Sequence, residues 1–381
     1  MMLNRYKDYD WWLISAAVLL SIFGAIMIYS ASFPLAIDLY DNPSHFFTRQ
    51  LIWFGGGMFL LVVFMHFRYP MFNKLSPLMI LGSIALLILV LVIGREVNGA
   101  KSWISAGPFS IQPSEFVKIA VIIYLAQVYS QKQAYINKFI SGVIPPLVVV
   151  VFIFSLIMLQ PDLGTAAALL MTAGIIVFLS GAKFRHLAVL ASLSGGVVAY
   201  FALTASYRIQ RLTAFRDPFE VAQEDMASGG GYQLIQSYIA IANGGITGVG
   251  LGQSVQKMHF LPEPHTDFIL AVVAEELGLL GIGFVLLCLG IIAWRGIIIG
   301  VRSKSSFGTL LAFGLVFQLV SQAVVNAGAA TGLMPITGLP FPFVSYGGSS
   351  LLVSLMAVGI LASISKENNR QKREVEEAGA A

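Results

Sequence analysis

Ten long runs of apolar residues, each bounded by charged residues, proline or glycine, dominate this sequence. A helix needs about 20 apolar residues to cross a bilayer, and most of the runs approach that length. The runs extend over residues 12–31, 50–67, 77–94, 115–129, 142–159, 163–180, 187–205, 268–294, 307–331 and 345–364. Only 11% of the residues are charged and 57% are hydrophobic, whereas about a quarter of a soluble domain is charged. The sequence therefore predicts an all-α polytopic membrane protein, with ten transmembrane helices in a single membrane domain over residues 1–381.

The first run resembles a secretory signal peptide in two respects. Arg5 and Lys7 precede it, and small residues follow at 30–32. However, the run is longer than the 7–15 apolar residues of a signal peptide, and Asp8 and Asp10 lie in its flank. We therefore expect a retained membrane anchor.

Lysine and arginine are distributed unevenly between the two sides that ten spans define. Because the number of spans is even, both termini lie on one side, and basic residues gather on the cytoplasmic side. The terminal side holds Arg5, Lys7, Arg68, Lys74, Lys132, Lys138, Lys183, Arg185, Arg295, Arg302, Lys304, Lys366, Arg370, Lys372 and Arg373. The opposite side holds Arg49, Arg95, Lys101, Arg208, Arg211, Arg216 and Lys257. The bias predicts that both termini lie in the cytoplasm, while the acidic residues gather toward the outside.

Several functional classes are excluded by composition. The only cysteine, Cys288, lies in an apolar run, so it cannot form an intramolecular disulfide. The basic residues build no continuous face, which argues against nucleic acid as a partner. The five histidines lack the H-E-x-x-H spacing or any comparable ligand pattern, so we expect no dedicated metal site.

One connection is much longer than the rest. Residues 206–267 separate the seventh and eighth runs and form the expected large extracellular loop. Loops of this length are usually functional or disordered. Residues 232–243, YQLIQSYIAIAN, are apolar enough for a membrane-surface helix or a re-entrant element. By contrast, residues 367–381 are expected to form a polar cytoplasmic tail.

Ionisable residues near the fourth span require an explanation, because a charge at membrane depth costs at least about 2.5 kcal/mol. Glu115 and Lys118 are three residues apart on one helix and can pair. They form either a structural ion pair or part of a polar cavity. Upstream, Lys101 and Trp103 are either an interface anchor or contacts to an anionic headgroup.

Two further polar segments lie at expected helix starts. Asp162 in QPDLGT has the position of a helix N-cap. Ser345 lies in PFPFVSYGGSS, a rigid turn that leads into a small-residue helix start. That turn either allows close helix packing or presents hydroxyl and backbone N–H groups to a phosphate.

The most informative cluster is FLPEPHTDF, residues 260–268, which leads directly into a span that contains Glu275 and Glu276. Asp267 either caps that helix or acts as a general base, because low-dielectric surroundings raise the proton affinity of a carboxylate. His265 lies two residues before it. Glu275 and Glu276 are alternatively buried structural partners.

Six segments in order resemble the SEDS family of shape, elongation, division and sporulation proteins. They are GAKSWISAGPFSIQPSEFVK (99–118), QPDLGT (160–165), GGYQLIQSYIAIANGG (230–245), LPEPHTDFI (261–269), EELGLLG (275–281) and FPFVSYGGSS (341–350). The segments extend over nearly the whole chain. Within the family, VGLGQSVQK (249–257) followed closely by LPEPHTDF is more similar to the division and sporulation members than to the elongation members.

The resemblance implies a peptidoglycan glycosyltransferase of the bacterial cytoplasmic membrane, which polymerises lipid II at the outer face of that membrane, here in cell division. It implies a class B penicillin-binding protein, other divisome membrane proteins and membrane lipid as partners. The family's essential aspartate corresponds to Asp267, and its glutamate and lysine of the fourth span correspond to Glu115 and Lys118.

In the mechanism expected from these residues, Asp267 removes a proton from the attacking sugar hydroxyl. Positive charge then stabilises the leaving pyrophosphate, with Lys118 and Lys101 as first choices among the cations. The only cofactor that this mechanism allows for is Mg²⁺ or Mn²⁺ bound with the substrate pyrophosphate, and no organic cofactor is expected. Glu115, Trp103, Asp162, His265 and Ser345 complete the expected substrate-binding set.

Three other functions compete with this interpretation. An elongation-type polymerase has the same chemistry. A lipid II flippase predicts that Glu115, Lys118, Glu275 and Glu276 line a path through the bilayer. A non-catalytic scaffold predicts that charge-neutral substitutions of Asp267 are harmless.

Overall fold

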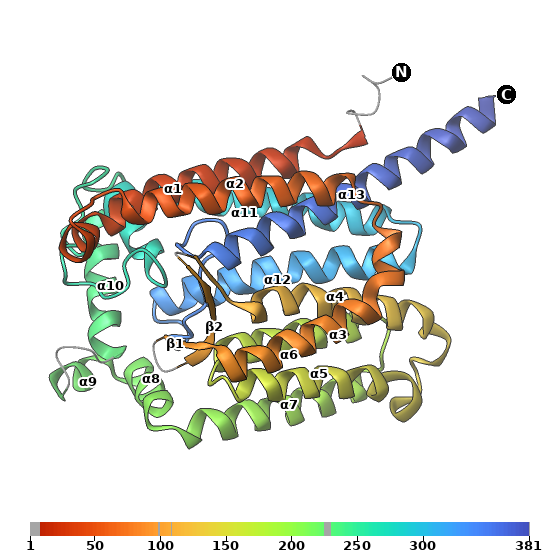
Figure 1. Ribbon diagram of the computed structural model, residues 1–381, viewed down its shortest axis with the longest axis horizontal. Helices are drawn as coiled ribbons and strands as arrows, with labels where there is room; N and C mark the ends of the chain where they lie inside the picture. The colour runs from red at the N-terminus through yellow and green to blue at the C-terminus, as the bar shows by residue number, and fades with distance from the viewer. Residues whose placement is uncertain (1–7, 98–99, 108, 225–229, 381) are drawn as a thin grey trace.

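The computed structural model describes residues 8–97, 100–107, 109–224 and 230–380. Arg5, Lys7, Gly99 and Ala381, on which some of the expectations above depend, lie outside the described residues. The described chain forms a bundle of long, roughly parallel helices (Figure 1). The first and last described residues lie at one end of the bundle, and α8–α10 lie at the other (Figure 1).

Ten helices coincide with the ten expected runs. They are α1 (Trp11–Tyr40), α2 (His45–His66), α3 (Pro70–Ile93), α4 (Pro113–Gln131), α5 (Ile144–Met158), α6 (Leu163–Leu179), α7 (Phe184–Thr204), α11 (Ile269–Arg302), α12 (Ser306–Ala330) and α13 (Gly348–Ala380). Among the described residues, eight helical segments are long and apolar enough to cross a membrane. Of the ten, α6 is shorter, and α4 carries Glu115 and Lys118. The chain is therefore a multi-pass helical membrane protein.

A small antiparallel sheet departs from the all-α expectation. Strands β1 (Arg95–Val97), β2 (Ala100–Ala106) and β3 (Phe109–Ile111) pair in the order β1–β2–β3 within the connection between α3 and α4. Ile104 pairs with Ile111 across the β2–β3 turn. The expectation was wrong here because the strands are too short to show a clear period-two pattern. Pairing between the strands satisfies the backbone N–H and C=O groups of this non-helical segment.

The C-terminal segment also differs from a simple polar tail. Residues 367–380 continue α13 as a helix. Arg370 pairs with Glu367 at 3.1 Å and with Glu374 at 3.3 Å, and such i,i+3 and i,i+4 pairs stabilise an exposed helix. The sequence interpretation weighed the polarity of this segment but not its charge spacing.

The long connection 206–267 contains α8 (Ser206–Arg216), α9 (Pro218–Glu224) and α10 (Gly230–Gly244). Helix α10 covers the expected apolar segment 232–243 and packs on α11. Between α4 and α5, a 3-10 turn (Gln133–Tyr135) and a π turn (Phe139–Val143) complete the order of elements.

Helix α13 forms the centre of the bundle. Its most apolar window is entirely buried, whereas none of the corresponding window of α7 is buried. Helix α13 packs mainly on α2, while α1 packs on α11 and α3 on α4. The approach of α1 to the turn before α13 requires glycine, because a Cβ at Gly24 would lie 2.4 Å from the carbonyl oxygen of Phe343.

Ion pairs fasten the two ends of the described chain together. Asp10 pairs with Arg295 of α11 at 2.7 Å, and Asp8 pairs with Arg373 of α13. Lys366 donates to the Tyr9 hydroxyl at 2.8 Å. The first described residues and the polar end of α13 therefore lie on the same side of the bundle.

Candidate functional site

Asp267 lies in the turn before α11, and α12 holds the backbone of that turn in place. The side-chain amide of Asn326 donates to the carbonyl oxygens of both Asp267 and Leu339, each at 2.8 Å. The amide thereby joins the turn before α11 to the turn before α13. Because the bonds are made to the main chain, the Asp267 carboxylate stays available for chemistry.

Ser345 and His265 strengthen the same junction. The Ser345 hydroxyl donates to the carbonyl of Thr266 at 2.6 Å and accepts from the N–H of Phe341 at 2.8 Å. The Tyr346 N–H donates to the carbonyl of His265 at 2.8 Å. Ser345 therefore holds the turn beside Asp267 in position. Its hydroxyl already makes two hydrogen bonds within the protein.

The His265 ring is buried against aromatic neighbours. Its centroid lies 4.7 Å from that of Phe46 and 5.5 Å from that of Tyr346. Burial lowers the pKa of His265 to about 4, and the opposing influence of Glu263 is smaller. The ring is therefore neutral at physiological pH and packs as part of the wall behind Asp267.

The electrostatics of Asp267 suit a general base. Burial, followed by repulsion from Glu263, raises the pKa of Asp267 to about 6, while the positive charge of Arg211 acts in the lowering direction. A carboxylate with a pKa just below the working pH is mostly ionised yet still binds a proton well. Arg211 comes from α8, so the long connection 206–267 supplies the cation beside this carboxylate.

Gly338 lies close to both of these charges. A Cβ built on Gly338 would lie 3.8 Å from Oδ2 of Asp267 and 3.9 Å from Nη1 of Arg211. Gly338 is exposed and has a φ of +74°, which also favours glycine. The half-buried carboxylate and guanidinium therefore lie beside one exposed position of the chain, which we call the Gly338 gap.

Glu115 and Lys118 form the predicted ion pair, which is confirmed at 2.8 Å with both side chains almost fully buried. Lys118 also donates to Oε1 of Gln322 at 3.0 Å. Gln322 in turn donates to the carbonyl of Pro340 at 2.9 Å. The pair is therefore connected through α12 to the turn that contacts Asp267.

Four helix N-termini meet around this site. Asp162 caps α6 by accepting from the Thr165 N–H at 3.0 Å, as predicted, and also accepts from Nε2 of Gln112 at 2.9 Å. Gln112 precedes α4, and its own N–H donates to Ser349 in the first turn of α13 at 2.9 Å. With α11 after Asp267, the positive ends of four helices gather on one side, which favours an anion there.

Lys101 and Trp103 do not join this cluster. The Lys101 ammonium donates to the carbonyls of Leu91 and Val92 at the end of α3, at 2.9 and 3.3 Å. Trp103 lies in β2 opposite Arg95 of β1. The Lys101 ammonium is therefore engaged within the protein, by the end of α3.

Glu275 and Glu276 bind the connection between α10 and α11. Glu276 pairs with Lys257 at 2.7 Å and accepts from Ser30 at 2.6 Å. Glu275 accepts from the N–H groups of Val255 and Gln256 at 3.2 and 3.3 Å. Both glutamates and Lys257 are buried, which matches the structural alternative for the glutamates and commits Lys257 to this cluster.

Sequence reasoning missed two side chains of α12. Gln322 and Asn326 bridge the ion pair, the Pro340 turn and Asp267, yet neither carries a charge. A signal was present in the spacing, since Gln318, Gln322 and Asn326 recur every four residues within an apolar run and so share one helix face. Polar side chains on one face of a span usually point into the bundle.

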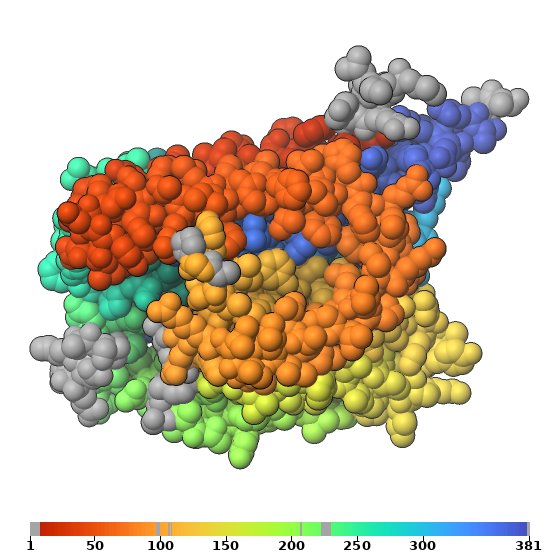
Figure 2. Space-filling view, in the orientation of Figure 1, coloured from red at the N-terminus to blue at the C-terminus, as the bar shows by residue number. Residues whose placement is uncertain are grey.

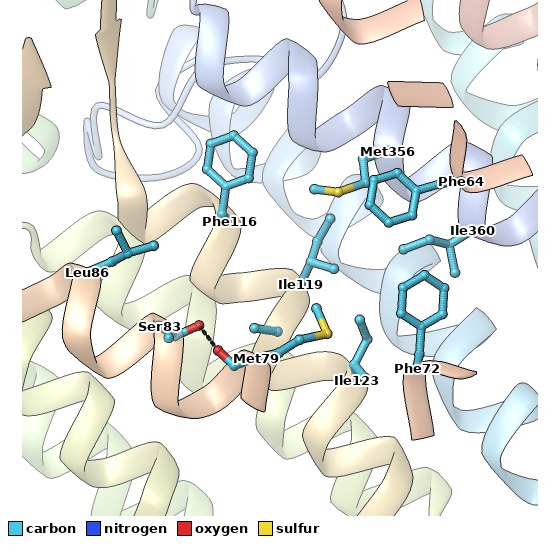
Figure 3. A pocket seen from close by; sticks show the side chains of 12 residues that line it. Phe64, Phe72, Met79, Ser83, Leu86, Phe116, Ile119, Ile123, Met356 and Ile360 are labelled. Atoms are coloured by element: carbon cyan, nitrogen blue, oxygen red, sulfur yellow. Dashed lines mark hydrogen bonds between the residues drawn. The ribbon is translucent and has the colours of Figure 1, made fainter. Parts of the chain in front are cut away.

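An apolar groove begins beside α4 and runs toward the other end of the bundle (Figures 2 and 3). Its volume is about 230 Å³, and its lining comes from α2, α3, α4 and α13. Phe116 and Leu86 lie toward one end, and Phe72 and Ile360 lie toward the other (Figure 3). Because Phe116 follows Glu115 directly, one end of the groove adjoins the polar cluster.

The described residues do not form a dedicated metal site. Within the described ranges, no group of three histidine, cysteine or acidic side chains is close enough to hold an ion. Glu263 is the acidic neighbour that affects Asp267, and two carboxylates alone make an incomplete ligand set for a divalent cation.

Comparison with known proteins gives a consistent family. Residues 10–370 match the model of the FtsW, RodA and SpoVE family, described as cell cycle proteins. The chain is 41% identical to the probable peptidoglycan glycosyltransferase FtsW of Bacillus subtilis, covering 98% of this chain and 96% of that protein. It is also 41% identical to stage V sporulation protein E of the same organism, covering 96% and 99%.

Solved structures give the same fold. A chain from work described as "Structural coordination of polymerization and crosslinking by a peptidoglycan synthase complex" matches with a TM-score of 0.75 and 27% identity, covering 94% of this chain and 98% of that one. The rod shape determining protein RodA of Thermus thermophilus matches with a TM-score of 0.66 and 27% identity, covering 94% and 97%.

Proposed function

Because this chain belongs to the FtsW, RodA and SpoVE family, we propose that it is a peptidoglycan glycosyltransferase that polymerises lipid II. The observation that carries the proposal is the gap at Gly338, which Asp267 and Arg211 face together. In the proposed orientation, ten helices cross the cytoplasmic membrane, both termini are cytoplasmic, and this gap opens at the outer face. The names of the relatives support the substrate class.

In the proposed reaction, a sugar hydroxyl of one substrate attacks the anomeric carbon of another. The new C–O bond forms as the bond from that carbon to the pyrophosphate breaks. Asp267 takes the hydroxyl proton, and the bonding electrons leave with the pyrophosphate. The Asp267 pKa of about 6 supports this role. Near neutral pH most of the carboxyl is ionised, and the carboxylate still has enough affinity for a proton to take it from the hydroxyl.

Arg211 is the cation that we assign to the leaving pyrophosphate. It lies beside the same gap as Asp267, and a guanidinium can bind two phosphate oxygens at once. The four helix N-termini add to the positive potential. Lys118, although buried, uses two of its three N–H donors on Glu115 and Gln322, so we assign it to holding the Pro340 turn and Asp267 in position.

The undecaprenyl chain would lie in an apolar groove between spans, and the groove end beside Phe116 is suitably placed. A divalent ion such as Mg²⁺ or Mn²⁺, if used, would be carried mainly by the pyrophosphate oxygens, because the described residues supply no three-ligand group. No step of the reaction above depends on a metal.

We propose a role in division, with a class B penicillin-binding protein and other divisome membrane proteins as partners. The segment VGLGQSVQK and the FtsW relatives support division, while the equal identity to stage V sporulation protein E keeps sporulation as the second candidate. Rescue of cells depleted of FtsW, but not of cells depleted of RodA, is the expected result. Rescue of RodA-depleted cells alone would contradict the division role.

The decisive experiment is polymerisation of lipid II by the purified full chain reconstituted in liposomes. Asp267→Asn keeps the size of the side chain but removes the base, so we expect activity to fall by at least about a hundredfold. Asp38→Asn is the matched control, because Asp38 is exposed and pairs with His259 at 3.0 Å, and it has no part in the contacts of Asp267 described above. Full activity of Asp267→Asn would exclude the proposed mechanism.

The same preparation distinguishes the flippase. A transporter would move labelled lipid II between leaflets without joining the sugars, and Asp267→Asn would leave that movement largely intact. The acidic and basic groups named for a transport path instead lie in two separate clusters, in which Glu115 pairs with Lys118, Glu276 pairs with Lys257, and Glu275 accepts from backbone N–H groups. This separation supports the polymerase.

A further inference from the structure

Arg49 is a partly buried cation that the reaction proposed above does not use. It lies in the second turn of α2, which begins at the end of the bundle that holds α8–α10 (Figure 1). Among the described residues, no carboxylate lies within ion-pair distance of its guanidinium. A partly buried guanidinium without a carboxylate partner favours an anionic ligand, because no counter-charge is paired with it.

The side chain of Arg49 reaches the turn before α13. Its guanidinium interacts with the hydroxyl of Tyr346, whose own N–H donates to the carbonyl of His265 at 2.8 Å. One turn further along α2, the ring of Trp53 packs on the start of α13 so closely that a Cβ at Gly348 would clash with it. This face of α2 therefore packs on the turn before α13 and on the start of that helix.

Arg49 and Arg211 lie at different places along one connection, the segment between α12 and α13. Nη1 of Arg211 lies 3.5 Å from the carbonyl oxygen of Ile336 in the first half of this segment. Arg49 instead meets the segment near its end, at Tyr346. The segment thus has one cation beside Asp267 and the Gly338 gap, and a second cation farther along.

Buried polar atoms close to Arg49 in α2 lack partners. Gln50 follows it directly and is fully buried, and neither polar atom of its side-chain amide has a hydrogen-bond partner among the described residues. The same is true of Nε2 of His45, which lies one helical turn before Arg49. Buried polar groups in proteins are nearly always hydrogen-bonded. These atoms therefore indicate that a polar ligand or water completes this region.

The joining of two lipid II molecules brings two pyrophosphates to the protein. One of them leaves as the new C–O bond forms, and Arg211 is assigned to it above. The other stays bonded to the substrate whose hydroxyl attacks, and it has to be held while that hydroxyl lies at Asp267. Because the sugars of the substrate separate this pyrophosphate from the attacking hydroxyl, its cation should lie near Asp267 but not beside it.

We propose that Arg49 binds the pyrophosphate of the substrate that supplies the attacking hydroxyl. A guanidinium can bind two phosphate oxygens at once, and the positive end of α13 lies beside the same face of α2. The inference rests on the proposed function, because it needs two lipid-linked substrates at one site. Arg49 is a binding residue and takes no part in making or breaking bonds.

The kinetics of lipid II polymerisation by the full chain in liposomes test this assignment. The retained pyrophosphate has the same charge before and during the reaction, so Arg49→Gln should raise KM about tenfold and leave kcat within about twofold. The leaving pyrophosphate gains charge in the transition state, so Arg211→Gln should lower kcat. A fall in kcat at unchanged KM for Arg49→Gln, or no change in either constant, overturns the proposal.

Two further variants separate binding from support of the fold. Arg95→Gln removes the same charge from an exposed residue of β1, on the same side of the membrane in the proposed orientation, and should leave KM unchanged. Tyr346→Phe removes the hydroxyl that contacts Arg49 but keeps the guanidinium, so its effect on KM should be clearly smaller than that of Arg49→Gln. If Tyr346→Phe or Arg95→Gln raises KM as much as Arg49→Gln does, the proposal fails.

Native mass spectrometry of the full chain carrying Asp267→Asn, with added lipid II, tests the site without turnover. We expect two bound molecules, of which Arg49→Gln weakens the retention of one about tenfold. Replacing both Arg49 and Arg211 should weaken both. If one molecule is then still retained at its original strength, the two cations share one pyrophosphate and the proposal is wrong. Joined sugars would appear as a product mass, so polymerisation by Asp267→Asn would contradict the proposed function without affecting the binding result.

Discussion

The proton affinity of Asp267 is set by its burial and by two neighbours of opposite charge. Glu263 raises the pKa of the carboxyl and Arg211 lowers it, with a balance at about 6. Only the ionised form accepts a proton, so kcat/KM for polymerisation should fall about tenfold per pH unit below pH 6 and level off above it. Glu263→Gln should move this acid limb to lower pH, and Arg211→Gln should move it to higher pH. A pH profile that shifts in the same direction for both variants would contradict this assignment.

Glu115 and Lys118 make a separate prediction about positioning. Lys118→Met leaves the buried carboxylate of Glu115 without its partner, which should destabilise the protein by about 3–5 kcal/mol. The double variant Glu115→Gln/Lys118→Met removes both charges and should recover most of that stability, measured as thermal unfolding in detergent. If Lys118 positions the Pro340 turn through Gln322, polymerisation stays low in the stable double variant. Full activity in that variant would limit the pair to a structural role.

At the scale of the element, α11 is a broken helix that the preceding connection completes. Gly278 has a φ of +61° within it, and the N–H groups of Val249 and Gly250 bond to the carbonyls of Glu275 and Glu276 at 2.9 and 3.0 Å. Backbone groups freed by a break at membrane depth need such partners. The motif EELGLLG therefore marks a junction, which its apolar length alone does not reveal.

The close approach of α10 to α11 gives a stability prediction. A Cβ at Gly244 would lie 1.8 Å from the carbonyl oxygen of Ala274. Backbone atoms cannot move aside as a side-chain tip can, so Gly244→Ala should destabilise the protein by about 3 kcal/mol or more. Gly174→Ala is the control, because a Cβ there has open space. Thermal unfolding in detergent should separate the two variants, and equal midpoints would contradict the packing of α10 on α11.

At the scale of the whole molecule, the sequence was most informative where one physical requirement dominates. Membrane thickness sets the length of each apolar run, so all ten helices were located. Several of them extend beyond the runs: α1 ends nine residues later than its run, α3 begins seven residues earlier, and α11 ends eight residues later. The Asp162 cap and the Glu115–Lys118 pair were also predictable, because they depend on local spacing. The contacts of Asn326 with Asp267 and of Arg211 with the Gly338 gap join segments far apart in the chain, and no local pattern encodes such a meeting.

Orientation is a property of the whole chain, and its lone cysteine makes the orientation measurable. Cys288 is buried, so Cys288→Ala gives a background without thiols at small cost in packing. Gln253 is exposed in the connection before α11, and Lys183 is exposed between α6 and α7. The proposed topology predicts that a membrane-impermeant maleimide applied to intact cells labels Gln253→Cys but labels Lys183→Cys only after the cells are opened. The reverse pattern would place the Gly338 gap in the cytoplasm, where the proposed reaction at the outer face could not occur.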